Sequence, residues 1–385
     1  MSKNKIYDSV VIGSGIAGCC VGYFLDKMGQ DVLILDRSAI AGSGGSGSAG
    51  AFVSPKIGKG SSLQELTNEA YLFAQKFYSA NFSKHFSQTG VIRLPKDEID
   101  SVKFDSYREF NGEFKDISFS ELGDIGIKSE FDGFLFSKAG VCDAPALCRE
   151  IISNLEFLQL DVQEITKVDD IWQIDNIKAK NIILSTGYEN ELFDMRYMGV
   201  KGTWGSRGDY YSNLELDVSM HKSISISANI NGIIKIGATH NKSKQPCMSC
   251  DGKPLASLEE SASKMVDSSD FRIKETFCGM RSGSKDYFPL VGGVIDVDKM
   301  FEKYPKITIG QRIKEPIDMV DNLYILNGLG GRGFVFAPLM AKKLAEHIIE
   351  ERELDRRVDP NRLFLKWCRK TNFSNPHSSN LPPHQ

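Results

Sequence analysis

A glycine-rich turn near the N-terminus is the feature that most constrains the fold. Three apolar residues, 10–12, lead into Gly13-Ser14-Gly15-Ile16-Ala17-Gly18, which has the spacing G-x-G-x-x-G. A helical pattern follows over residues 16–28, and a second apolar run, 32–35, ends on Asp36. In this context the glycines allow a tight turn and close approach to a pyrophosphate, and Asp36 would accept hydrogen bonds from a ribose. The flanking elements favour a dinucleotide site over a plain strand–helix turn, but the motif does not distinguish FAD from NAD.

The composition is that of an ordinary globular protein. The chain has 385 residues, of which 41% are hydrophobic and 25% charged, so it is long enough for two domains or one elaborate domain. Its net charge of −3 argues against a strongly electrostatic nucleic-acid binder but does not exclude a local basic patch. Because there is no apolar run of about 18 residues and no signal-peptide pattern, we expect no membrane span and a cytoplasmic location.

The eight cysteines are scattered along the chain, and in a reducing compartment we expect them to be mostly buried thiols. Cys247 and Cys250 form a lone C-x-x-C pattern without a second pair. This favours a surface loop over a zinc site, and no metal site is predicted.

Directly after Asp36, residues 41–51 are almost entirely glycine, serine and alanine. Read alone, they could form a flexible linker. Their position behind the ribose-binding acid instead favours a loop that presses its backbone against the cofactor. A helical pattern returns over residues 61–86.

The middle of the chain returns to alternating helices and strands. Asp143 is placed to cap a helix over residues 145–154, which precedes a predicted strand at 157–165. A later strand, 179–184, ends in the small-residue turn Ser185-Thr186-Gly187, as a strand of the nucleotide-binding sheet would.

Between residues 200 and 239 the pattern changes to consecutive strands, at 202–211, 223–229 and 233–239. Asn231-Gly232 between the last two is a strong hairpin signal. Strands without intervening helices predict an antiparallel sheet, and therefore a second domain inserted into the first.

A second strand–glycine loop–helix unit lies near the C-terminus. The strand is expected at 322–327, the loop runs Gly328-Leu329-Gly330-Gly331-Arg332-Gly333-Phe334, and a helix is expected from about Ala337-Pro338 to residue 351. Beyond residue 366 the chain is polar and rich in proline, so we expect a flexible tail over 366–385.

The predicted fold class is therefore α/β. A Rossmann-like FAD-binding domain, with a parallel sheet and flanking helices, is expected over residues 1–90, 140–195 and 320–355. An inserted, mainly antiparallel substrate domain is expected over residues 91–139 and 196–319.

Together these segments resemble the D-amino-acid-oxidase-type family of FAD-dependent oxidoreductases over about residues 5–355. In that family the second glycine loop closes over the flavin, which favours FAD over NAD. The closest resemblance is to the oxidase half of the bifunctional enzymes that modify the wobble uridine of tRNA. It is carried by Gly44-Gly45-Ser46-Gly47, by Gly279-Met280-Arg281 with Asp286 and Pro289, and by the loop 328–333 followed by Ala337-Pro338-Leu339. Ala49-Gly50 replaces a more polar pair, and the segment matching the methyltransferase half is missing.

The resemblance implies a noncovalent FAD site, because the offset of Cys278 does not fit a covalent flavin link. The implied cofactor-binding residues are Gly13, Ser14, Gly15, Ile16, Ala17, Gly18, Asp36, Arg37, Gly44, Ser46, Gly47, Ala49, Gly50, Ala51, Val162, Thr186, Gly187, Gly330, Gly331, Arg332, Gly333 and Phe334.

The resemblance also implies a reaction. An N-substituted glycine, the 5-carboxymethylaminomethyl group of the tRNA wobble uridine, would lose a hydride to the flavin, and hydrolysis of the imine would give glyoxylate and 5-aminomethyluridine. Arg281 is the expected catalytic residue and would bind the substrate carboxylate; a structural ion pair with Asp286 is the alternative. Lys285 and Tyr287 are further candidates for substrate contacts. No general base is nominated.

The expected partners are tRNA and a separate methyltransferase that acts on the product. Basic residues in loops or in the inserted domain could contact tRNA, although a solvated surface is the commoner explanation for them: Lys56, Lys59, Lys201, Arg207, Lys242 and Lys244. Two other functions stay open. One is oxidation of free glycine, sarcosine or a D-amino acid, and the other is non-catalytic binding of FAD or tRNA.

Overall fold

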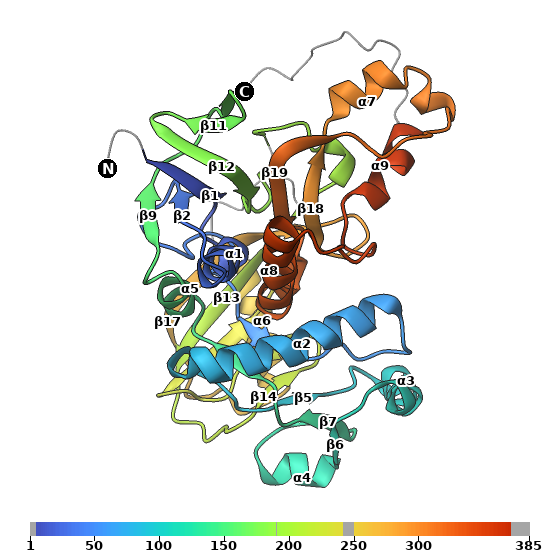
Figure 1. The fold of residues 1–385 in the computed structure, drawn as a ribbon. Coiled ribbons are helices and arrows are strands. Elements are labelled where there is room, and N and C mark those ends of the chain that lie inside the picture. Colours follow the sequence, from blue (N-terminus) through green and yellow to red (C-terminus); the bar gives the residue numbers. More distant parts are fainter. Residues whose placement is uncertain (1–4, 190, 242–249, 371–385) are drawn as a thin grey trace.

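Two large sheets organise the chain (Figure 1). The structure is a computed structural model and describes residues 5–189, 191–241 and 250–370. The first sheet has a parallel centre, in the order β9 (Glu156–Gln159), β2 (Val32–Asp36), β1 (Ile6–Ile12), β12 (Ile177–Leu184) and β19 (Met319–Asn327). Antiparallel strands extend it: β18 (Leu290–Ile295) pairs with β19, and the hairpin β10 (Thr166–Val168)–β11 (Ile171–Ile174) pairs with β12. The predicted α/β class is confirmed.

Helices cover both faces of this sheet, because the strands at its centre are apolar on both sides. One face packs against α1 (Ile16–Lys27), α5 (Ala144–Ile151) and α8 (Gly333–Glu350). The other packs against α7 (Val297–Lys303) and α9 (Asn361–Cys368). The long helix α2 (Ser62–Asn81) packs on α8 and lies between that helix layer and the second sheet (Figure 1).

The second sheet is antiparallel except where β14 pairs with β5. Its order is β17 (Arg272–Gly283), β13 (Lys201–Tyr211), β16 (Ile233–Gly237), β15 (Ser225–Ile226), β14 (Ser219–His221), β5 (Val91–Arg93), β7 (Gly133–Phe136) and β6 (Lys115–Ile117). Helices α4 (Phe119–Asp124) and α6 (Lys253–Ser263) contribute Leu122 and Leu258 to its core. Helix α3 (Glu98–Tyr107) packs Phe104 on Phe134. A small third sheet contains β3 (Phe52–Val53), β8 (Gly140–Cys142) and β4 (Phe86–Ser87).

Two local signals in the sequence correspond to the structure. Asn231 and Gly232 both have positive φ, 54° and 78°, as a type I′ hairpin turn requires. The Asp143 side chain accepts a hydrogen bond from the Ala146 N–H and caps α5. The strands of the second sheet come from residues 91–136 and 201–283, which lie within the two segments predicted for the substrate domain; the domain boundaries themselves stay a prediction.

Other predicted bounds were wrong. The strand expected at 157–165 is only β9, and the strand expected at 223–229 only β15, because regular ladder pairing with their neighbours is confined to these residues. Residues 366–368 of the expected tail belong to α9, which buries Phe364 and Cys368; residues 371–385 lie outside the described residues. No described helix has both the length and the apolar character needed to cross a membrane.

Helix α8 begins at Gly333, four residues before the predicted start, so that Pro338 lies inside it. Proline has no N–H, which leaves the Phe334 carbonyl without its usual donor four residues later. The hydroxyl of Tyr78, which is fully buried in α2, donates to this carbonyl at 3.0 Å. A side chain of α2 therefore replaces the missing helical hydrogen bond and joins the two helices.

We expect Tyr78→Phe to lower the free energy of unfolding by about 1–3 kcal/mol, because it leaves a buried carbonyl without a partner. In a Pro338→Ala background the alanine N–H can bind the Phe334 carbonyl, and the same change should then cost clearly less. Urea unfolding of the four proteins measures this coupling. An equal loss in both backgrounds would contradict the assignment.

Candidate active site

A cavity of about 1450 Å³ lies between the carboxyl ends of the parallel strands and the face of the second sheet. This exceeds the roughly 300–1,000 Å³ of pockets that hold one small ligand. Its walls come from the glycine turn after β1, the loop 43–51, the turn 185–187, strand β17 and the loop 328–333. Segments from both ends of the chain therefore meet around one space.

Close packing of two glycines shapes the nucleotide end of the cavity. Gly13 has a φ of 102°, which favours glycine. A Cβ on Gly18 would lie 1.8 Å from the Gly13 carbonyl oxygen, so only glycine lets α1 approach the turn this closely. The N-cap residue of α1 is Gly15, which has no side chain to accept a hydrogen bond from the first turn. The Ile16 N–H donates to the Ser46 hydroxyl instead, at 2.9 Å. That contact from the distant loop was not predicted.

Asp36, at the end of β2, is held by three hydrogen bonds. Its Oδ2 accepts from the Ser14 N–H and the Ser14 hydroxyl, both at 2.7 Å, and its Oδ1 accepts from the Ser38 N–H at 2.8 Å. A carboxylate has about four acceptor positions, so one remains for a ligand hydroxyl. This fits the predicted role in binding ribose.

The loop 41–51 is a series of turns fixed to the second sheet, and the interpretation as a flexible linker was wrong. The Ser48 hydroxyl donates to the Cys278 carbonyl at 2.8 Å. The Arg207 guanidinium, only 3% exposed, donates to the Ala49 carbonyl and forms an ion pair with Asp209. Arg207 was named among the basic residues that could contact tRNA; it is buried and supports this loop instead.

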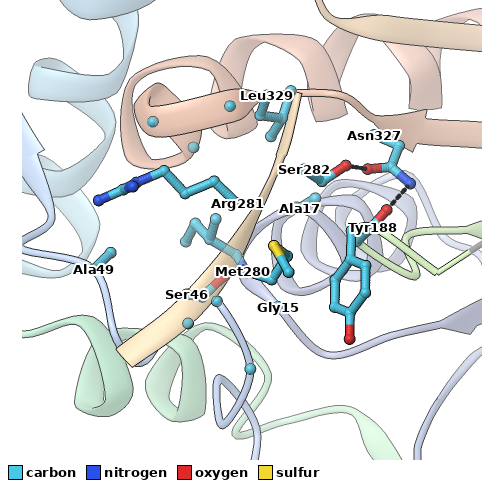
Figure 2. A pocket seen from close by; sticks show the side chains of 18 of the residues that line it. Gly15, Ala17, Ser46, Ala49, Tyr188, Met280, Arg281, Ser282, Asn327 and Leu329 are labelled. Atoms are coloured by element: carbon cyan, nitrogen blue, oxygen red, sulfur yellow. Dashed lines mark hydrogen bonds between the residues drawn. The ribbon is translucent and has the colours of Figure 1, made fainter. Parts of the chain in front are cut away.

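The loop after β19 is held by Asn327. Its Nδ2 donates to the Gly187 carbonyl at 2.6 Å, and its Oδ1 accepts from the Ser282 hydroxyl at 2.6 Å and the Gly328 N–H at 2.7 Å. Figure 2 shows Ser282 joined to Asn327, while Arg281 on the same strand points the other way. One amide thus fixes the relative positions of β17, the turn 185–187 and the C-terminal glycine loop.

Most of the predicted site residues line this cavity. Those that line it are Gly13, Gly15, Ile16, Ala17, Asp36, Arg37, Gly44, Ser46, Ala49, Gly50, Ala51, Val162, Thr186, Gly187, Arg281, Tyr287, Gly330, Gly331, Arg332, Gly333 and Phe334. Ser14, Gly18, Gly47 and Lys285 do not line it. Ser14 and Gly18 support the turn from behind, and the Lys285 side chain lies beside Gly199.

Arg281 lies within the cavity without a carboxylate partner among the described residues. Its Nη1 donates to the Thr239 carbonyl at 3.1 Å, and its side chain lies against Gly205 and Gly331. Asp286, the alternative partner, forms an ion pair with Arg362 at 2.8 Å instead. Burial lowers the pKa of Arg281, and burial followed by the charge of Arg281 lowers the pKa of His240. The guanidinium is therefore a half-buried cation without a counter-charge among the described residues.

The sequence missed a second group of basic side chains in this cavity. Arg93 on β5 and His221 on β14 line it, as does Lys56, which was considered for a tRNA-contacting surface. Lys59 and Lys201 are exposed, and Lys242 and Lys244 lie outside the described residues.

Tyr287 contributes to the cavity wall although it is 76% exposed. Its φ of 69° is strained for a residue other than glycine.

Cys250 and Cys278 form a disulfide with their Cα atoms 5.3 Å apart, so the expectation of free thiols was wrong for this pair. Cys19, Cys20, Cys142, Cys148 and Cys368 are free and buried. Cys247, the other half of the C-x-x-C pattern, lies outside the described residues.

The model of the FAD dependent oxidoreductase family, DAO, matches residues 8–347. The chain belongs to this family. It is accordingly an FAD-dependent oxidoreductase.

The curated relatives are bifunctional proteins. The tRNA 5-methylaminomethyl-2-thiouridine biosynthesis bifunctional protein MnmC of Legionella pneumophila is 25% identical over 386 residues, which cover 93% of this chain and 57% of the relative. The same protein of Shewanella frigidimarina is 22% identical, covering 95% of this chain and 59% of the relative. The chain thus spans less than two thirds of the relatives' length, which is consistent with the oxidase half alone.

Solved structures share the fold. Glycine oxidase from Bacillus cereus superposes with a TM-score of 0.75 at 17% identity, covering 90% of this chain and 96% of that one. Iminodiacetate oxidase from Chelativorans superposes with a TM-score of 0.73 at 16% identity, covering 91% and 98%.

The cavity of this FAD-dependent oxidoreductase fits the cofactor. A Cβ on Gly44, Gly187 or Gly330 would meet no protein atom within 4 Å, so these glycines leave room for a ligand along the wall. The Ser185 hydroxyl, also in the wall, is buried without a hydrogen-bond partner in the described structure. A bound dinucleotide would fill this space, with its pyrophosphate at the N-terminus of α1.

We expect Gly18→Ala to weaken FAD binding at least tenfold, or ~1.4 kcal/mol, because the added methyl group forces α1 away from the turn. The flavin-to-protein absorbance ratio of the purified protein measures this. Gly123→Ala, in α4 where a Cβ would meet nothing within 4 Å, is the control. Full flavin content in Gly18→Ala would contradict the assignment.

Proposed function

We propose that the protein oxidises an N-substituted glycine, most specifically the 5-carboxymethylaminomethyl group of the wobble uridine in tRNA. The observation that carries this proposal is Arg281, a half-buried guanidinium that lies in the cofactor cavity of an FAD-dependent oxidoreductase and has no carboxylate partner among the described residues. A partly buried cation without a counter-charge favours an anionic ligand, and a glycine unit supplies one in its carboxylate.

In this proposal Arg281 binds the carboxylate and fixes the position of the glycine Cα. The hydrogen bond to the Thr239 carbonyl and the contact with Gly331 limit where the guanidinium can point. FAD, when bound, supplies the electron acceptor for the C–N oxidation. Water then hydrolyses the resulting imine to glyoxylate and 5-aminomethyluridine.

The positive charge of Arg281 also affects the protonation of the substrate amine. A secondary amine is oxidised as the neutral form, and a nearby cation disfavours its protonation. Arg281 therefore helps to deliver the amine unprotonated, so that no side chain need remove its proton at the moment of reaction. We assign no general base.

Two observations support tRNA as the carrier of the substrate. The curated relatives are named for tRNA modification, and Tyr287 presents an exposed ring at the cavity wall. Proteins recognise unstacked bases by stacking them on aromatic rings, and enzymes that modify a base take it out of the stack. A separate methyltransferase would then act on the exposed primary amine.

FAD is proposed to bind noncovalently. Cys278 lines the cavity, but its sulfur is bonded to Cys250 and is not available for a thioether link to the flavin.

Anaerobic mixing tests the proposed function. The oxidised protein is mixed with tRNA that carries the carboxymethylaminomethyl group, with unmodified tRNA, and separately with glycine and sarcosine. We expect the flavin to bleach with the modified tRNA only. Bleaching by the free amino acids alone would identify an amino-acid oxidase, and no bleaching by any of them would favour a non-catalytic binding protein.

We expect Arg281→Ala to lower the second-order rate of flavin reduction about a hundredfold, because truncating one partner of a buried charge pair costs ~2–5 kcal/mol. Rapid-mixing absorbance at several substrate concentrations measures it. Arg312→Gln, at an exposed arginine outside the cavity, is the matched control. An unchanged rate in Arg281→Ala would remove this residue from the site.

We expect Tyr287→Ala to raise the KM for modified tRNA about 5- to 100-fold, as the loss of one base–aromatic stack of ~1–3 kcal/mol would do. Oxidation of the free modified nucleoside at saturation should change little. The control is Tyr211→Ala, which removes a half-exposed tyrosine of β13 outside the cavity. Equal effects of the two substitutions would argue against stacking.

A further inference from the structure

Four side chains surround Ser54 in the part of the cavity next to β5 and β14; we call them the Ser54 cluster. They are Lys56, Arg93, His221 and Arg332. Arg93 Nη2 donates to the Pro55 carbonyl at 2.8 Å, Arg332 Nη1 to the Ser54 carbonyl at 3.4 Å, and His221 Nε2 lies 3.3 Å from the Ser54 hydroxyl. Three segments that are far apart in sequence thus bring basic groups to one place.

No acid among the described residues of the cavity wall compensates the cluster. The acidic residues of the cavity wall are Asp36, Asp161, Glu189 and Glu191, which belong to the nucleotide end; Glu189 is paired with Arg37 there. Arg93 Nε is buried without a hydrogen-bond partner in the described structure. Burial and mutual repulsion lower the pKa of Arg93 to about 9, and burial lowers that of Arg332 to about 10, so both still carry a charge at neutral pH.

The Ser54 cluster is distinct from the Arg281 site. Arg281 is on β17, the first strand in the order of the second sheet, whereas Arg93 is on β5, the sixth. Burial and then the charges of Arg93 and Arg332 lower the pKa of His221. Burial and then the charge of Arg281 lower the pKa of His240. The cavity therefore holds two separate cationic groups, and one carboxylate can neutralise only one of them.

Apart from Arg332, which the family resemblance assigns to the FAD site, the cofactor does not account for the second group. Its pyrophosphate belongs at the N-terminus of α1, beside the Gly13 turn. A second anion must come from the substrate. When the amine is carried by a nucleotide, the anion that always accompanies it is a phosphate, and guanidinium groups match the geometry of phosphate oxygens.

We propose that the Ser54 cluster binds a phosphate of the nucleotide that carries the N-carboxymethyl amine, while Arg281 binds the carboxylate. This inference rests on the proposed function for the identity of the amine. The site then recognises its substrate at two anionic groups, one at each end of the modified nucleotide. Free glycine and sarcosine, which lack the phosphate, leave the Ser54 cluster uncompensated and are poor substrates.

Binding of unmodified nucleotides tests the phosphate site without any catalysis. Calorimetric titration of the FAD-loaded protein with uridine 5′-monophosphate and with uridine should give at least tenfold tighter binding of the monophosphate. Arg93→Gln should remove this difference, and Lys96→Gln, at an exposed lysine near β5, should leave it intact. If Arg93→Gln does not fold, Lys56→Gln is the second variant. It should also reduce the preference for the monophosphate over uridine. Equal binding of the two ligands by the wild-type protein would overturn the proposal.

Oxidation assays separate this inference from the proposed function. 5-Carboxymethylaminomethyluridine and its 5′-monophosphate are compared as substrates, with the KM of the monophosphate expected to be at least tenfold lower. Arg93→Gln should raise only the KM of the monophosphate; equal increases for both would place the carboxylate at the Ser54 cluster and overturn the proposal. If neither compound is oxidised but uridine monophosphate binds as described, the proposed function fails and the phosphate site stands.

Discussion

The parallel pairing of β1 with its neighbours is the constraint on which the site depends. Ile12 is level with Leu35 of β2 and with Leu184 of β12, and Leu184 is level with Ile325 of β19. Because these strands run in one direction and end together, the turns that follow them converge at one edge of the sheet. Those turns hold the first glycine motif, Asp36, the Ser185 turn and the second glycine loop. Without this register the four segments, separated by up to about 300 residues, would not share a cavity.

The sequence predicted the features that depend on a few neighbouring residues. The first glycine motif, the cap at Asp143 and the Asn231–Gly232 turn each act through hydrogen bonds and dihedral angles within a short segment, so their residues are sufficient to identify them. The start of α8 shows the opposite case. Proline normally belongs in a first turn. What permits Pro338 inside the helix is the hydroxyl of Tyr78, which donates to the carbonyl of Phe334, 256 residues away in the chain.

The same distinction explains which parts of the site were missed. The family resemblance pointed to Arg281, and among the described residues it has no acidic partner, because Asp286 is paired with Arg362. Arg207 and Arg93 gave no such signal. A basic residue is usually solvated, and only the fold reveals that one supports the loop 41–51 from the protein interior and that the other faces the cavity. Pairing of Cys250 with Cys278 likewise depends on a contact across 28 residues.

The distribution of charge along the cavity gives the site a direction. Its acidic side chains lie at the nucleotide end, whereas Arg281 and the Ser54 cluster, which have no acidic partners among the described residues, lie toward the second sheet. A neutral or cationic ligand would leave several partly buried cations uncompensated, which is unfavourable. An anionic amine both neutralises this end and, beside the cations, is held in its unprotonated form. Selection for anionic amines and preparation of the amine for oxidation therefore follow from one electrostatic arrangement.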